Sequence, residues 1–510
     1  MTKIRALWIG LALAMMGGHW ATPCAGETNR ARASAHAARS EGLDRRLELL
    51  IEKASLGPVQ MGVCLVDCRT GEVLAGSNQK VPLIPASNMK LLTSGVATLV
   101  LGPEFQFRTR LVRDGDKLVL IGGGDPAFGD PELLRDMKLS AGGLLDRLLE
   151  PAKAAKLTGI RQVVVDDRIF DRELVHPSWP VDQLNRWYCA EVTGLIFHTN
   201  VLSVFPTPGP RPGPAPMPAL EPSAPWIEVV NLVQTVATGS TKIGAFRDAP
   251  LRFKVTGSIR AAPDAPIDVT VTDAPMMVAR MLADRVAEAG LGGAGAEAPV
   301  WRRAEPGERL SDREVLAVVR TPLATVLRRC NIDSHNLYAE ALIKLLGHEV
   351  TGQAGSWGTG ATVLRMQIGQ RVKLDNGELV VADGSGMSRD NRVSAQALAR
   401  WLGAMSRAPA ATAEAFIASL PVPGEGTLAR RFRGRDGITG EVRAKSGFIN
   451  GVQCLSGYVT HGDRRVAFSV LVNNITSQTP GGRVKAFHED VVELVDQWLA
   501  GEAGGDQMGG

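Results

Sequence analysis

The chain has 510 residues, and 57 basic against 53 acidic side chains leave a net charge of only +4. This balance, without a basic cluster, argues against a nucleic-acid-binding protein. The eight histidines are scattered without an H-E-x-x-H motif, which argues against a zinc peptidase, so we expect neither a metal nor a cofactor. The length leaves room for two or three domains.

The first residues have the layout of a secretory signal peptide. Residues 1–5 are basic, residues 6–16 form a short apolar run, and a stretch of small residues ends at Ala25. The run is too short to span a bilayer comfortably. We therefore expect residues 1–25 to be removed and the mature chain to be periplasmic or extracytoplasmic, without an integral membrane segment. A retained N-terminal anchor is the alternative, and Cys24 lacks the lipobox of a lipoprotein.

Five cysteines remain after this segment, an odd number without metal-ligand spacing. Cys64 and Cys68 lie four positions apart on a predicted strand, which is too far for an easy disulfide. We interpret the remaining cysteines as core thiols. The same region predicts a helix over residues 42–56 and a hairpin of strands 59–67 and 72–75.

The motif S-x-x-K occurs twice, beginning at Ser77 and at Ser87. Two prolines follow the first copy closely and disfavour a helix, so we predict that Ser77 lies in a loop. The second copy opens a largely apolar run long enough to be a buried helix. Ser87 would then lie in the first turn, where unpaired N–H groups and the helix dipole favour a developing alkoxide, with Lys90 on the same face. An isolated match of this kind would most often be only an N-cap.

Residues 111–314 are predicted to form a large insertion with short β stretches, such as 118–121 and 162–166. Residues 206–225 carry nine prolines and are predicted to be an extended, polyproline-like surface connection without regular structure. A proline-rich segment for docking a partner is the alternative interpretation.

Two further motifs follow the insertion. Ser334-His335-Asn336 is the chain's one S-x-N sequence, and it opens a predicted amphipathic helix that ends at Gly347. Lys445-Ser446-Gly447 is the one K-[ST]-G sequence, and it is expected where a strand runs into a turn. Strands 454–459 and 465–472 should continue an antiparallel meander with the lysine near its edge, before a long helix over 483–500. Each motif alone is weak evidence, but together, in this order, they predict an active-site serine enzyme.

With these motifs the chain resembles the D-alanyl-D-alanine carboxypeptidase/endopeptidases among the low-molecular-mass penicillin-binding proteins. The similarity is to the branch with a large insertion between S-x-x-K and S-x-N, and it extends over about residues 40–500. Other matching stretches are Gly122-Gly123-Gly124-Asp125-Pro126, Asp383-Gly384-Ser385-Gly386-Met387-Ser388-Arg389 and Gly426-Thr427-Leu428.

The resemblance implies a role for each motif residue. Ser87 would be the nucleophile, Lys90 the base and Ser334 a proton relay. The substrate-binding residues would be Asn336, Lys445, Ser446, Gly447 and Phe448. The family usually has Thr or Ser where this chain has Phe448, so one hydroxyl contact is expected to be missing. Peptidoglycan stem peptides would be the substrates and β-lactams covalent inhibitors.

The predicted fold is α/β (α+β), with a catalytic domain like that of penicillin-binding proteins and β-lactamases, in which helices flank an antiparallel sheet. We predict that a β-rich insertion splits this domain into residues 41–110 and 315–501, followed by a flexible tail at 502–510. The leading function is a serine-type D-Ala-D-Ala carboxypeptidase with DD-endopeptidase activity. A β-lactamase or esterase on the same fold and an inactive cell-wall-binding protein are the alternatives. The intact motifs argue against the last of these.

Overall fold

The computed structural model describes residues 41–293, 295, 297–479 and 481–506. The predicted signal peptide at 1–25 and Cys24 lie outside the described residues. Within this part of the chain, no helix is both long and apolar enough to cross a membrane.

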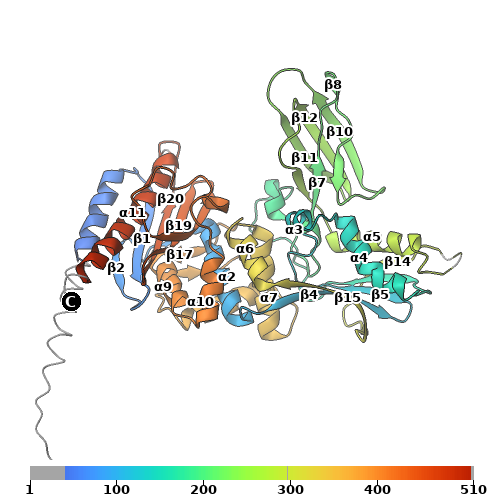
Figure 1. Cartoon of the computed structure of the whole chain (residues 1–510), viewed down its shortest axis with the longest axis horizontal. Coiled ribbons are helices and arrows are strands. Elements are labelled where there is room, and N and C mark those ends of the chain that lie inside the picture. Colours follow the sequence, from blue (N-terminus) through green and yellow to red (C-terminus); the bar gives the residue numbers. More distant parts are fainter. Residues whose placement is uncertain (1–40, 294, 296, 480, 507–510) are drawn as a thin grey trace, which may run out of the picture.

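One antiparallel sheet joins the two ends of the described chain (Figure 1). Its strands, in spatial order, are β18 (Glu441–Ile449), β19 (Val452–His461), β20 (Arg464–Asn473), β1 (Gln60–Asp67) and β2 (Val73–Ser77). β20 pairs with β1 along the whole length of β1, from Gln60 opposite Asn473 to Asp67 opposite Val466. β18 is an edge strand, as the predicted meander requires.

Both faces of this sheet are buried, because alternate residues of each strand face opposite sides. In β1, Val63 and Leu65 pack with apolar residues of the helix 41–54 and of α11 (Gly481–Asp506). Cys64 and Val66 belong to a second core that includes α2 (Met89–Leu101) and α9 (Ala395–Ser406). The predicted α/β fold with helices flanking an antiparallel sheet is confirmed.

A second sheet, of mixed strand direction, is separated from the first sheet by helices (Figure 1). Its order is β14 (Val300–Arg303), β6 (Gln162–Asp166), β5 (Lys117–Ile121), β4 (Gln106–Asp114) and β15 (Glu314–Pro322). β4 and β15 are antiparallel neighbours, so the chain leaves towards this region and returns from it side by side. The helices α4 (Ala141–Ala154) and α5 (Ala274–Glu288) contribute apolar side chains to its core.

Two smaller sheets complete this part of the molecule and project from it (Figure 1). One contains β11 (Lys242–Ala249), β12 (Arg252–Ile259), β10 (Glu228–Thr235) and β8 (Gly213–Pro214), and the other β13 (Ile267–Thr270), β7 (Val201–Phe205) and β9 (Ala219–Glu221). The remaining elements include α3 (Pro131–Asp136), α6 (Leu323–Asn331), α7 (Asn336–Thr351), α8 (Trp357–Gly369), α10 (Ala410–Ala418), β3 (Pro82–Leu83), β16 (Leu379–Val380) and β17 (Arg392–Ser394).

The proline-rich segment 206–225 contains β8 and β9, so the prediction that it lacks regular structure was wrong. Pro214 lies at the edge of its sheet, opposite Gln234 of β10, where a residue without an N–H group is tolerated. Ser77 is the last residue of β2 and not a loop residue, because it pairs with Val63 of β1. The domain boundaries predicted from the sequence stay a proposal.

The predicted end of the helix after the S-x-N motif was also wrong. α7 does not end at Gly347 but continues to Thr351, and Gly352 caps it with a φ of 68°. Gly347 instead permits close packing of α7 on α8, since a Cβ there would lie 2.2 Å from Thr359 Oγ1. At the K-[ST]-G motif the prediction is confirmed, because β18 continues through the motif to Ile449 and a turn follows before Val452, with which Ile449 pairs.

The C-terminal helix is also longer than the predicted 483–500. α11 runs from Gly481 to Asp506, five residues into the segment expected to be a tail, and 507–510 lie outside the described residues. The five cysteines of the described chain are free and buried, as expected for core thiols.

Candidate active site

Ser87 and Lys90 lie at the start of the most buried helix of the catalytic region. Ser87 is in the 3-10 turn Ala86–Asn88, which leads directly into α2. The helical spacing places the two side chains together, with Lys90 Nζ 3.1 Å from Ser87 Oγ. Ser87 is half-buried, whereas Lys90 is fully buried, so the hydroxyl remains accessible while the amine is shielded from water.

Lys90 Nζ has two further partners from distant segments. It donates to Asn336 Oδ1 at 2.7 Å and to the Ser385 carbonyl at 3.0 Å. The Asn336 amide is oriented by its own Nδ2, which donates to the Tyr188 carbonyl at 3.0 Å, so its oxygen faces the lysine. The first and second motifs are therefore in direct contact.

The same surroundings favour the neutral amine. Burial lowers the pKa of Lys90 to about 8, although the carboxylates of Glu340 and Asp383 act in the opposite direction. A neutral amine keeps two N–H bonds, which suit Asn336 and Ser385, and turns its lone pair towards the Ser87 hydroxyl. This is the arrangement of a general base beside a nucleophile.

Lys445 is also fully buried, on edge strand β18. Its Nζ donates to the Ser446 carbonyl at 2.7 Å. Burial, and secondarily the charge of Lys90, lower the pKa of Lys445 well below its usual value. Two ammonium groups in one buried region oppose each other, so the site favours at most one charge.

Gly447 brings β18 against the turn that carries Ser87. A Cβ at this position would lie 3.1 Å from Ser87 N and 2.8 Å from the Pro85 carbonyl, so a larger residue would push the strand away. Asn88 strengthens the same junction, because its Nδ2 donates to Ser456 Oγ on β19 at 2.7 Å. The third motif therefore lies beside Ser87. Ser446 is half-buried.

Phe448 is 69% exposed, which makes it one of the most exposed large apolar residues of the described chain. It lies opposite Gln453 of β19, directly after Gly447. Its ring is thus not held in the protein core.

Ser334 precedes α7 and has a φ of 59°, in the left-handed region. This uncommon conformation for a serine is held by the neighbouring Arg329, which bonds Asp333 through Nη1 at 2.7 Å and accepts the His335 N–H on its carbonyl at 3.2 Å. In the part of the chain that the structure describes, the Ser334 hydroxyl has no hydrogen bond to Ser87 or Lys90. A proton relay through it would need a substrate or water between them.

A loop that contacts Lys90 contributes to the site, and the sequence did not predict this contribution. Residues 383–388 wrap around two buried carboxylates, and Glu340 Oε1 accepts the N–H of Ser385 at 2.7 Å. Glu340 Oε2 accepts the N–H of Gly384 at 2.9 Å and Trp357 Nε1 at 2.7 Å. Asp383 Oδ1 accepts the N–H of Gly386 at 2.8 Å. These bonds aim the Ser385 carbonyl at Lys90.

One feature of the sequence could have indicated the role of Glu340, namely that it is a charged residue within the apolar run that forms α7. All of the residues from Asn336 to Gly347 are buried, so a carboxylate there must have partners inside the protein. Burial and the charge of Asp383 raise the pKa of Glu340 to about 7.

The sequence and the fold were each compared with known proteins, and the comparisons agree with one another. Residues 43–493 match the model of the D-Ala-D-Ala carboxypeptidase 3 (S13) family. A D-alanyl-D-alanine carboxypeptidase of Actinomadura sp. (strain R39) is 33% identical over 485 residues, which is 88% of this chain and 84% of the relative. A carboxypeptidase of Mycobacterium tuberculosis is 24% identical over 432 residues, with 82% and 77% covered. Penicillin binding protein 4 of Haemophilus influenzae shares the fold, with a TM-score of 0.69 at 20% identity over 87% of this chain and 98% of that one.

Proposed function

Because the chain belongs to the D-Ala-D-Ala carboxypeptidase 3 (S13) family and is a serine-type carboxypeptidase, we propose that it hydrolyses the terminal D-Ala-D-Ala bond of peptidoglycan stem peptides through an acyl-enzyme on Ser87. We propose in addition that it cleaves D,D cross-links between stem peptides. The observation that carries the proposal is the contact of Lys90 Nζ with both Ser87 Oγ and Asn336 Oδ1, at 3.1 and 2.7 Å.

In the proposed reaction, neutral Lys90 accepts the proton of Ser87 as Oγ attacks the substrate carbonyl. The N–H groups of Ser87 and Phe448 stabilise the oxyanion of the tetrahedral intermediate. Ser334 passes a proton to the nitrogen of the leaving D-Ala, and the acyl-enzyme is then hydrolysed by water. The close approach of Gly447 to Ser87 N supports this oxyanion site, because it brings the following residue, Phe448, near the nucleophile.

Lys445 and Ser446 are proposed to bind the terminal carboxylate of the substrate. Burial disfavours the protonated form of Lys445, and a bound carboxylate would offset this desolvation. The same residues would hold the carboxylate of a β-lactam, and we propose that β-lactams acylate Ser87. The Haemophilus influenzae relative has been solved in complex with a β-lactam, which supports this part of the proposal.

The proposed substrates lie outside the cytoplasm, and we propose that the protein acts there. The arrangement of basic, apolar and small residues in 1–25 supports an exported protein.

Incubation with purified muropeptides tests the function directly. The wild-type protein should release D-Ala from pentapeptide monomers and convert cross-linked dimers to monomers, and Ser87→Ala should do neither. Ser77→Ala serves as the matched control, because it removes the serine of the other S-x-x-K sequence and should retain both activities. Release of D-Ala by Ser87→Ala at the wild-type rate would refute the proposal.

A further inference from the structure

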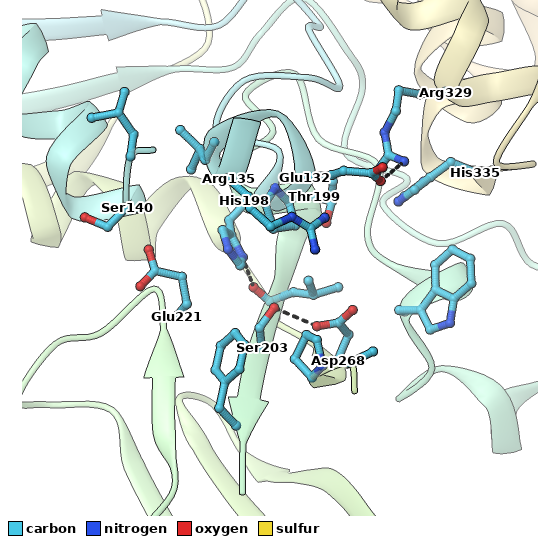
Figure 2. Close-up of a pocket in the computed structure, with 18 of the residues that line it drawn as sticks. Glu132, Arg135, Ser140, His198, Thr199, Ser203, Glu221, Asp268, Arg329 and His335 are labelled. Carbon is cyan, nitrogen blue, oxygen red and sulfur yellow. Dashed lines mark hydrogen bonds and ion pairs between the residues drawn. The ribbon is translucent and has the colours of Figure 1, made fainter. Parts of the chain in front are cut away.

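A cavity of about 660 Å³ lies beside the loop that carries the S-x-N motif (Figure 2). It is lined by α3, by β7 and by the loop of the S-x-N motif. Asp333 and His335, which flank Ser334, both line it, as does Trp187, whose neighbour Tyr188 accepts the Asn336 amide. None of the proposed catalytic residues lines this cavity.

Two buried histidine nitrogens in the lining have no hydrogen-bond partner among the described residues. They are Nε2 of His198 and Nδ1 of His335. His198 Nδ1 lies 3.1 Å from the Val201 carbonyl, so the proton is on Nδ1 and Nε2 is left as an acceptor. Burial lowers the pKa of both rings, so both are neutral. Buried polar atoms normally have partners, so both nitrogens point to a polar ligand, and the acceptor Nε2 of His198 calls for an N–H or O–H group on it.

The acidic side chains that line the cavity have partners, whereas two of the basic ones have none among the described residues. Its four carboxylates are engaged: Asp268 accepts from Ser203, Glu221 from the N–H of Ala141, and Glu132 and Asp333 from Arg329. In contrast, Arg135 and Lys138 are exposed at the cavity and have no side-chain partner in the described chain. The cavity therefore has two cations and two buried histidine nitrogens without partners among the described residues.

Figure 2 shows how these groups are distributed along the cavity. Ser140 and Glu221 lie at one end, Arg329 and His335 at the other, and His198 and Arg135 between them. The cavity volume is in the range of sites that bind multi-atom ligands, and it exceeds the volume of a single side chain.

We infer that this cavity binds the second stem peptide of a cross-linked substrate while the scissile bond lies at Ser87. A stem peptide supplies amide N–H groups for His198 Nε2, amide N–H or carbonyl groups for His335 Nδ1, and carboxylates for Arg135 and Lys138. A glycan strand supplies hydroxyl groups but does not explain the free cations. The inference rests on the proposed function and adds a binding site that distinguishes cross-linked from uncross-linked peptides.

Binding is measured on Ser87→Ala protein by calorimetry, with a purified cross-linked muropeptide dimer and the corresponding monomer. We expect the dimer to bind about tenfold more tightly, as for one or two charge-assisted contacts. Arg135→Glu/Lys138→Glu in the same background should remove this difference. Arg211→Glu/Lys242→Glu, which reverses two exposed charges of the inserted segment outside the cavity, should retain it.

Equal affinities for dimer and monomer, or equal effects of the two double variants, would overturn the inference. Displacement of the dimer by peptide-free glycan strands would assign the cavity to glycan and overturn it as well. The proposed function fails separately, if wild-type protein neither releases D-Ala nor reacts with labelled penicillin. An active enzyme that binds dimer and monomer equally would retain the function and lose only this site.

Discussion

Lys90 is held by partners that suit its neutral form. Asn336 and Ser385 accept its two N–H bonds, at 2.7 and 3.0 Å, and the remaining direction faces Ser87. No carboxylate bonds the amine directly, so its charge is not stabilised by an ion pair among the described residues. Burial lowers the pKa of Lys90 to about 8, so a substantial fraction of the amine is neutral near neutral pH, as a general base requires.

Acylation should therefore depend on pH through Lys90. The deprotonated amine is the base, so the rate of acylation by a penicillin should rise with pH and level off above about 8. Below that value it should fall about tenfold per pH unit, because the neutral fraction falls by that factor. Stopped-flow acylation from pH 5.5 to 9.5 measures this profile. Lys90→Ala is the control and should abolish acylation; a flat wild-type profile would contradict the assignment of the base.

We propose that Phe448 occupies the position at which the Thr or Ser usual in the family would contact the substrate carboxylate. Phe448→Thr should add one charge-assisted hydrogen bond, worth about 1.5–3 kcal/mol where it is buried, and so tighten β-lactam binding. The acylation step itself should change little, since the backbone N–H is retained. Fitting the acylation rate against penicillin concentration separates the two effects. Unchanged or weaker binding would mean that the ring forms part of the cleft wall.

The elements around the site differ in how well the sequence predicts them. The helix after Ser87 and the strands after Lys445 have strong apolar patterns, and the structure contains all of them. β8 and β9 were missed because they are short, lie in a proline-rich segment and pair with strands outside that segment. The i,i+3 spacing predicted the proximity of Ser87 and Lys90, and their catalytic roles stay a proposal.

The contribution of Ser385 could not be predicted, because it depends on its backbone. Its carbonyl is a partner of Lys90 only because Glu340, on α7, binds the N–H groups of the loop. No side-chain pattern encodes this contact. The order of the motifs predicts which segments meet, whereas the loop that completes the site depends on tertiary packing.

Glu340→Gln tests whether α7 positions this loop. An amide cannot accept at both ends, so at least one buried N–H would lose its partner, at about 1–3 kcal/mol of stability. Acylation should slow, and its apparent pKa should shift below about 8, because the Glu340 charge raises the pKa of Lys90. Glu349→Gln, exposed on the same helix, should alter neither. A slower reaction with an unshifted pKa would mean that the carboxylate supports folding alone.

Across the whole molecule, one arginine connects the inserted segment with the S-x-N loop. Arg329 on α6 bonds Asp130 at 2.9 Å, Glu132 and Asp333, and Asp130 also accepts from Tyr338 at 2.6 Å. Asp130 and Arg329 are both buried, so the pair is shielded from water. The insertion is thus fastened to the helix that carries Asn336.

Arg329→Met should leave the Asp130 carboxylate buried without its partner and lower the free energy of unfolding by about 3–5 kcal/mol. Urea unfolding followed by circular dichroism measures this change. Arg328→Met is the matched control, since Arg328 has only an exposed pair with Glu425, and it should change stability by less than about 1 kcal/mol. Equal effects of the two variants would show that the buried pair does not hold the insertion.

The proposed function depends most directly on Ser87 being the nucleophile. Purified protein is labelled with a penicillin, digested, and the adduct located by mass spectrometry. We predict a single adduct on Ser87 that is lost in Ser87→Ala and retained in Ser77→Ala. An adduct on Ser77, or undiminished labelling of Ser87→Ala, would contradict the assignment of Ser87 as the nucleophile.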